Sequence, residues 1–199
     1  MIKNIIFDFG DIFINLDKQA IFRAIRNGDI QDFMPRYSEL NNDLEVGNIS
    51  PTEFLDRLQA DFPKLSTSEI ADIWNSILLD FPEYRLNFLE ELANEKKYRL
   101  FLLSNTNALH ISHVGQIMGR DRYTRFKGCF EQFYLSHEIR LRKHDREIFQ
   151  FVLDQNNLQA AETLFIDDTL ENTEAAAILG IQVWNLQVGK EDIVGLKLP

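Results

Sequence analysis

The chain of 199 residues has a single cysteine, Cys129. A lone cysteine excludes an internal disulfide and a cysteine-based zinc site, so we expect a small buried or half-buried thiol. The sequence also lacks an apolar run long enough to span a membrane and a signal-peptide pattern at its first residues. We therefore expect a cytoplasmic protein that does not contact a membrane.

Positive charge is scarce, because 21 lysines and arginines face 31 aspartates and glutamates. A nucleic-acid-binding surface needs an excess of basic side chains to neutralise phosphates, so the composition argues against nucleic acid as a partner. A phosphorylated small molecule would need its positive charge from a bound metal or from a few well-placed lysines and arginines. Length and composition otherwise indicate an ordinary globular protein of one large or two small domains.

Residues 2–11, IKNIIFDFGD, are the stretch around which the rest of the chain is organised. Their apolar run predicts a buried strand that ends at Asp8 and is followed by Gly10. A buried carboxylate is costly unless it has partners or a function. From this segment alone, a turn-capping aspartate and a functional one are equally good interpretations.

Residues 17–81 have a helical pattern, with apolar side chains at helical spacing. The sequences SPTE at 50–53 and STSE at 66–69 are helix N-terminal capping signals. We therefore expect a helical cap formed by 17–81, inserted into a core of 1–16 plus 82–199. Some cap residues could either line a binding site or pack the helices: Phe22, Phe33, Tyr37, Glu45 and Trp74.

From residue 82 onward, expected helices alternate with expected strands. The helices cover 84–96, 109–118, 147–155 and 170–179, and the strands cover 98–103, 130–135, 163–166 and 181–184. This alternation predicts an α/β fold, a Rossmann-like open parallel sheet with helices on both faces. Ligands of such sheets bind beyond the carboxyl ends of the strands.

Polar side chains follow four of the expected strands, at the edge where ligands of such sheets bind. Asp8 follows the first strand, 104–107 the second, Lys143 lies in the loop after the third, and Asp167 and Asp168 follow the fourth. Adjacent carboxylates repel one another without a cation, whereas a helix N-cap role would explain only one of the two acids. The acidic pair therefore indicates a metal site.

Five segments carry a resemblance to a known family: DFGDIFINLD, EVGNIS, LLSNTNALH, LSHEIRLRKHDREIF and FIDDTLENTEAA. In order and spacing the sequence resembles the haloacid dehalogenase superfamily. Within it, the sequence is similar to the phosphatases with a small helical cap after the first strand, such as bacterial alpha-D-glucose-1-phosphate phosphatase. The resemblance covers essentially the whole chain. It implies a Mg²⁺-dependent hydrolase of a small phosphorylated metabolite, such as a sugar phosphate.

The resemblance also implies which residues act. Asp8 would attack phosphorus and form an aspartyl-phosphate, since a carboxylate is ionised at neutral pH without a helper base. Asp8, the Gly10 carbonyl and Asp168 would bind Mg²⁺, and Asp167 would reach it through water.

Further residues would hold the phosphate and the site. Ser104 and the Asn105 backbone N–H would bind phosphate oxygens. Lys143 would pair with Asp8 and the phosphate, and Asn172 would orient the acidic pair or Lys143. Asn107 could instead cap the next helix.

The sequence departs from the family pattern at two places. Gly10 stands where many relatives have a second aspartate as general acid, and Asp11 is the nearest substitute, either as an acid or as a turn cap. Around Lys143, Arg140 and His144 replace the usual glycine and proline, which alters the expected loop geometry. Three further histidines, His110, His113 and His137, have no metal-ligand spacing with acids or cysteines. We interpret them as surface or helix-cap residues.

Two alternative functions stay open. In a haloacid dehalogenase Asp8 would attack carbon without a metal, against which the pair Asp167 and Asp168 argues. In a non-catalytic phosphate-binding or phospho-accepting module, phosphorylated Asp8 would not turn over. For the enzyme we expect a small-molecule phosphate ester as partner and a monomer or weak homodimer.

Overall fold

The centre of the protein is a parallel sheet of five strands in the order β3-β2-β1-β4-β5. The computed structural model describes residues 1–24 and 30–198, with side chains for 1–24 and 37–198. The strands are β1 (Asn4–Phe7), β2 (Arg99–Ser104), β3 (Gln132–Leu135), β4 (Thr163–Asp167) and β5 (Gln182–Asn185). All neighbours pair in parallel, and β1 lies between β2 and β4. The predicted Rossmann-like α/β fold is confirmed.

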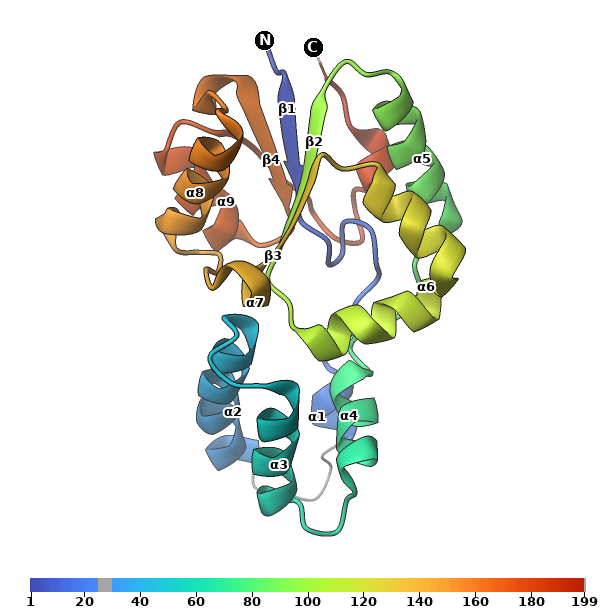
Figure 1. Cartoon of the computed structure of the whole chain (residues 1–199), viewed down its shortest axis with the longest axis vertical. Coiled ribbons are helices and arrows are strands. Elements are labelled where there is room, and N and C mark those ends of the chain that lie inside the picture. The colour runs from blue at the N-terminus through green and yellow to red at the C-terminus, as the bar shows by residue number, and fades with distance from the viewer. Residues whose placement is uncertain (25–29, 199) are drawn as a thin grey trace.

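Helices cover both faces of the sheet (Figure 1). On one side lie α5 (Glu83–Asn94) and α6 (Ala108–Gly128), and on the other α8 (Arg146–Asn156) and α9 (Leu170–Ile178). Successive strand residues point to opposite faces. Ile5 and Phe7 thus join the core beneath α5 and α6, whereas Ile6 joins the core beneath α8 and α9. The first strand is therefore buried from both sides, which fixes the position of the residue that follows it.

Helix α6 is longer than the apolar pattern predicted. The pattern predicted an end at residue 118, but the helix resumes after Gly119, whose φ of 73° and ψ of 157° are not helical. Glycine adopts this conformation without a Cβ clash, so it marks a kink. Beyond the kink, Phe126 is fully buried and its ring packs against Phe13 and Phe81. Tertiary packing therefore extends the helix where the local pattern stops.

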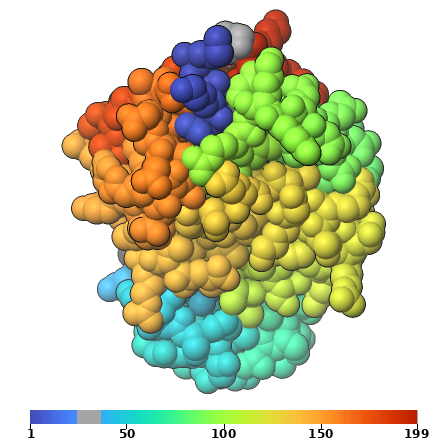
Figure 2. Space-filling view, turned by 45° about the horizontal axis from the view of Figure 1, so that its top comes forward, coloured from blue at the N-terminus to red at the C-terminus, as the bar shows by residue number. Residues whose placement is uncertain are grey.

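The inserted segment forms the cap helices α1 (Ala20–Ala24), α2 (Ile30–Glu45), α3 (Pro51–Asp61) and α4 (Thr67–Asn75). They lie beyond the carboxyl ends of the strands (Figure 1) and form one end of the molecule, directly against the core (Figure 2). They enclose a small core of their own, made by Tyr37, Leu44, Ile49, Phe54, Leu58, Ile70 and Trp74.

The capping signals of the cap helices act as expected at both serines. Ser66 and Glu69 form a complete capping box at the start of α4. Ser50 accepts a hydrogen bond from the Glu53 N–H at 3.1 Å, but the Glu53 side chain pairs with Arg57 instead of reaching back. No helix in the described part of the chain is both long and apolar enough to cross a membrane.

Candidate active site

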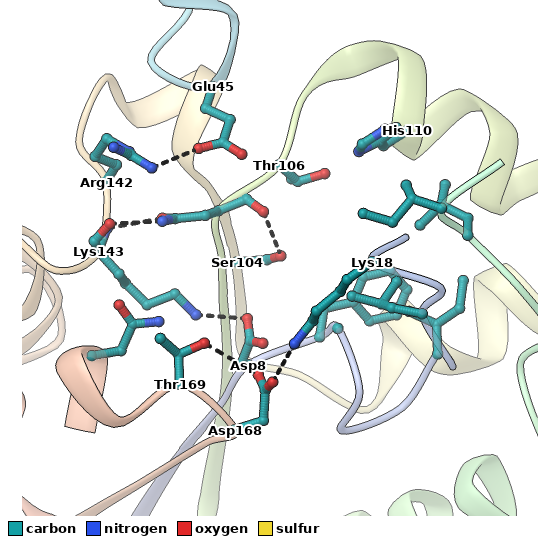
Figure 3. Close-up of a pocket in the computed structure, with 18 of the residues that line it drawn as sticks. Asp8, Lys18, Glu45, Ser104, Thr106, His110, Arg142, Lys143, Asp168 and Thr169 are labelled. Atoms are coloured by element: carbon teal, nitrogen blue, oxygen red, sulfur yellow. Dashed lines mark hydrogen bonds and ion pairs between the residues drawn. The ribbon is translucent and has the colours of Figure 1, made fainter. Parts of the chain in front are cut away.

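A pocket lies between the carboxyl edge of the sheet and the cap helices (Figure 3). Its walls come from the ends of β1 and β2, the start of α6, the loop before α8, the β4–α9 loop and the cap. The polar residues that line it are Asp8, Lys18, Glu45, Ser104, Asn105, Thr106, His110, Arg142, Lys143, His144, Asp168, Thr169 and Asn172. The carboxyl edge is where open parallel sheets bind their ligands.

At the floor of the pocket Lys143 joins two carboxylates. Its Nζ is 2.6 Å from Asp8 Oδ1 and 2.7 Å from Asp167 Oδ2. All three side chains are buried, and Asp167 is completely inaccessible. Among the described residues, the second carboxylate oxygen of Asp8, Oδ2, has no hydrogen-bond partner. Lys143 therefore orients Asp8 through one oxygen and leaves the other available.

Electrostatics at this floor favour a cation. Burial raises the pKa of Asp8 to about 7, with the charge of Lys143 opposing and that of Asp167 adding to the rise. Burial by itself lowers the pKa of Lys143, but Asp167 and Asp8 more than compensate and leave that pKa above its usual value. A desolvated carboxylate gains from every positive charge placed beside it. A divalent cation would thus favour the ionised form of Asp8.

The two acids after β4 lie in different surroundings. Asp167 accepts hydrogen bonds from the Asn172 side chain at 3.0 and 3.1 Å and from the Thr169 N–H at 2.8 Å. Asp168 lines the pocket and pairs with Lys18 at 2.6 Å. Asp167 is therefore saturated by protein donors, whereas Asp168 is open to a ligand.

Asp8, Asp167 and Asp168 could together hold a metal ion. Each offers one carboxylate oxygen, and these oxygens lie within 4.8 Å of one another. An all-oxygen set of this charge suits Mg²⁺, which prefers carboxylates, carbonyls and water. The saturated position of Asp167 suits contact through water, and Gly10 lines the same pocket beside Asp8. The donor set therefore fits the ion that the sequence implied.

Asn105 fixes the loop that carries Lys143. Its side chain donates to the Lys143 carbonyl at 2.7 Å and accepts from the Lys143 N–H at 2.8 Å. Earlier in this loop Arg140 has a φ of 58°, a left-handed conformation that glycine adopts more readily than arginine. The peptide bond between Lys143 and His144 is cis. The loop thus brings Lys143 to the site without the expected glycine and proline.

The end of β2 supplies hydroxyl and amide groups. Ser104 is buried and lines the pocket. The Ser136 hydroxyl accepts a hydrogen bond from the Thr106 N–H at 2.9 Å and donates one to the Thr106 carbonyl at 3.0 Å. Asn107 accepts from the His110 N–H at 3.0 Å and is the N-cap of α6, one of its two expected roles. Ser104 and Thr106 are therefore the two hydroxyl-bearing residues of this strand end that line the pocket.

Asp11 does not line the pocket. Its carboxylate accepts from the Leu16 N–H at 3.1 Å and pairs with Lys18 at 2.9 Å. These contacts match the turn-capping interpretation. Gly10 leaves room for Leu16, because a Cβ at position 10 would lie 2.7 Å from the Leu16 Cδ1 atom.

Of the cap residues considered, Glu45 lines the pocket. Tyr37 and Trp74 belong to the cap core, and Phe22 is not among the lining residues described. The side chain of Phe33 lies outside the described residues. Sequence spacing could not separate lining from packing residues, because the difference depends on how the cap helices pack onto the core.

The sequence predicted that His110 is a surface or helix-cap residue, but its ring is half-buried at the pocket. It lines the pocket, stacks on Trp74 at 5.6 Å between ring centroids, and lies 3.3 Å from the Trp74 carbonyl. Burial lowers the pKa of His110 to about 4, although the Trp74 carbonyl partly offsets this. The Asn107 amide nitrogen faces Nδ1, so Nε2 carries the proton and donates to that carbonyl. His110 therefore joins the core to α4 as a neutral ring.

Lys18 and Arg142 were also missed as pocket residues. Lys18 is the second residue of the cap segment and Arg142 precedes Lys143, so each lies beside a recognised motif. Local patterns do not mark either residue, because their partners Asp168 and Glu45 are distant in sequence.

The family model described as haloacid dehalogenase-like hydrolase matches residues 2–180. The chain is 27% identical over 198 residues to D-ribitol-5-phosphate phosphatase of Bacteroides thetaiotaomicron, covering 96% of this chain and 95% of the relative. A crystal structure of a haloacid-dehalogenase-family enzyme of Bacteroides thetaiotaomicron, in complex with magnesium and inorganic phosphate, is 32% identical, with a TM-score of 0.81 over 96% of this chain and 97% of that one. A haloacid-dehalogenase-like hydrolase of Porphyromonas gingivalis is 28% identical, with a TM-score of 0.80 over 96% and 94%. By its sequence and its fold, the chain belongs to the haloacid dehalogenase-like hydrolase family.

Proposed function

We propose that this protein is a Mg²⁺-dependent phosphatase that hydrolyses the phosphate ester of a small hydroxylated metabolite, a sugar or sugar-alcohol phosphate. The observation that carries the proposal is the buried Asp8 whose Oδ1 is held by Lys143 at 2.6 Å inside a pocket that also contains Asp168 and Ser104. The named activity of the Bacteroides thetaiotaomicron relative supports the same reaction class. Residues 17–81 would act as the cap over this site, and 1–16 plus 82–199 as the catalytic core.

The chemistry begins at Asp8. Its unpartnered oxygen attacks phosphorus, the ester oxygen leaves, and water then hydrolyses the aspartyl-phosphate to release phosphate. Lys143 keeps the carboxylate in place and neutralises part of the negative charge that gathers there. Ser104 and the Asn105 N–H would donate to phosphate oxygens.

Asp8, Asp168 and the Gly10 carbonyl would hold Mg²⁺, with Asp167 acting through water. The bound ion would supply positive charge that offsets repulsion between the carboxylate and the phosphate. Asn172 would support this site by fixing Asp167, which it contacts through both carboxylate oxygens. Asp11, whose carboxylate is taken by Leu16 and Lys18, would stabilise the turn below the nucleophile.

Gly10 bears on the choice of ester. Without a carboxylic acid two residues after Asp8, the departing oxygen leaves with little protonation, so more acidic alcohols are favoured. An anomeric hydroxyl is such an alcohol, which favours sugar 1-phosphates. The relative named above is instead a phosphatase of a terminal phosphate on a sugar alcohol. Both ester types belong in the test.

The test is phosphate release from D-ribitol 5-phosphate, D-glucose 1-phosphate and D-glucose 6-phosphate, with Mg²⁺ and with a chelator. We expect turnover only with Mg²⁺, and none from Asp8→Asn, because an amide does not attack phosphorus. Mass spectrometry of the quenched wild-type enzyme should show one phosphoryl group on Asp8.

A matched control is Asp56→Asn, which removes an exposed carboxylate on α3 and should retain full activity. Unchanged turnover in Asp8→Asn would remove the proposed nucleophile. Halide release from a 2-haloacid without Mg²⁺ would identify a dehalogenase, and a stable phosphoryl group without turnover would identify a phospho-accepting module.

A further inference from the structure

The end of the pocket away from Asp8 and Asp168 carries an ion pair between cap and core (Figure 3). Arg142 Nη2 is 3.0 Å from Glu45 Oε2, and both side chains are largely buried. The second oxygen of Glu45 accepts from Asn41 Nδ2 at 3.1 Å. Among the described residues, the Arg142 Nε–H is buried without an acceptor. This pair therefore lines the pocket at the end away from Asp8.

The position of Glu45 is set by a close backbone contact. Gly47, in the turn after α2, has a φ of +67°, and a Cβ there would lie 2.5 Å from the carbonyl oxygen of His137. His137 belongs to the short helix α7 (Ser136–Ile139) of the core. Because this turn contacts α7 directly, the position of Glu45 relative to the core is fixed.

The charges along the pocket separate into two ends. The lysines, Lys18 and Lys143, contact Asp168 and Asp8 at the phosphate end. Glu45 and Arg142 make up the other end, where their charges cancel. His110 adds no charge near pH 7, since its pKa lies near 4. The far end is therefore polar but close to neutral.

We propose that the Glu45–Arg142 pair selects phosphate esters whose tail is neutral and bears hydroxyl groups, and rejects esters whose tail carries a second anion. The inference rests on the phosphatase function proposed above and names its substrate class. A hydroxyl can donate to Glu45 and accept from Arg142 at once. A carboxylate tail meets the charge of Glu45 and competes with it for Arg142, and like charges in a desolvated site repel strongly.

The experiment compares D-glucitol 6-phosphate with 6-phospho-D-gluconate, which differ only in a terminal hydroxymethyl or carboxylate group. Dissociation constants are measured by calorimetry on Asp8→Asn protein, so binding is read without turnover, and kcat/KM is measured on protein with Asp8 intact. With Glu45 present we expect the glucitol ester to bind about tenfold or more tightly, the range of one charge-assisted hydrogen bond. Glu45→Gln should shift the ratio toward the gluconate ester by about the same factor.

Arg142→Met should move the ratio the opposite way, because it leaves the Glu45 carboxylate without its cation. Combining both substitutions should return the ratio toward that of the unsubstituted pair. Glu53→Gln, which changes an exposed glutamate of α3 paired with Arg57, is the matched control and should change neither ratio nor rate.

Three outcomes would overturn the inference: equal losses on both esters in the two single variants, which would mean a simple latch between cap and core; an unchanged ratio in Glu45→Gln; or no binding of either ester. Selective binding without turnover in the protein with Asp8 intact would instead overturn the phosphatase proposal and support the selectivity. Thermal unfolding of each variant checks that it is folded.

Discussion

The ammonium of Lys143 lies 2.6 Å from the carboxylate of Asp8, with the two side chains only 2% and 11% exposed. These residues are 135 positions apart in the sequence. Asp167 accepts from the same ammonium, so one cation lies between two buried carboxyl groups. Removing one member of such a group leaves charge without a partner.

Lys143→Met should therefore lower the free energy of unfolding by about 3–5 kcal/mol, because Asp8 and Asp167 then face each other without a cation. Urea unfolding near neutral pH, with a chelator to exclude metals, measures the loss. Adding Asp167→Asn to this variant should restore part of it. A loss of unfolding free energy below about 1 kcal/mol would show that Asp8 and Asp167 do not depend on the Lys143 ammonium.

Asp168→Asn should weaken Mg²⁺ binding by about tenfold or more while leaving stability nearly unchanged, since Asp168 is open to the pocket. Asp167→Asn should affect the metal less and the fold more, because Asp167 is fully buried and bonded to Lys143 and Asn172. Calorimetric titration with Mg²⁺ and thermal unfolding separate the two effects. Small and equal effects of both substitutions would return the pair to a helix-capping role.

His110 should make the fold less stable in mild acid. Its pKa is about 4 in the folded protein and near 6.5 when unfolded, so between these values the unfolded chain binds the extra proton. This contribution destabilises the fold progressively as pH falls from about 6.5 to about 4. A pKa difference of one corresponds to about 1.4 kcal/mol, and solvent at the partly exposed ring reduces the total to about 2 kcal/mol.

His110→Phe keeps a ring against Trp74 but removes the titration, so its unfolding free energy should depend less on pH in this window. The measurement is the difference between wild type and variant in urea unfolding from pH 7 to pH 4.5, which cancels the other titrating groups. Parallel pH curves for the two proteins would show that His110 is not buried as a neutral ring.

Arg140→Gly should stabilise the protein by about 1 kcal/mol. Arg140 is exposed and ends α7 in the left-handed conformation, with a φ of 58°. Glycine adopts this conformation without the Cβ clash that costs other residues roughly 1–2 kcal/mol. Part of this gain is lost because glycine has more conformational entropy in the unfolded chain. Thermal unfolding should show a higher Tm for Arg140→Gly and no gain for Arg140→Ala, which retains the Cβ. Equal Tm values for the two variants would remove the backbone explanation.

Features that depend on neighbouring residues could be predicted from the amino-acid sequence. The apolar run before Asp8 makes a strand buried on both faces, and the Ser66 and Glu69 pair starts a helix where expected. Alternating helices and strands imply parallel pairing, which brings Asp8 and Asp167 to one edge. Hydrophobic periodicity and capping act over a few residues, and the order of helices and strands along the chain determines the parallel pairing.

Which of these polar groups become partners depends on contacts between residues far apart in the sequence. Asn105 was expected to offer its backbone to phosphate, yet its side chain also clamps Lys143 from 38 positions away. Glu45 reaches Arg142 across 97 positions, and His110 reaches Trp74 of the cap. Such contacts depend on how the inserted helices pack onto the sheet edge. That packing follows from shape and buried area over the whole molecule, which no local pattern records.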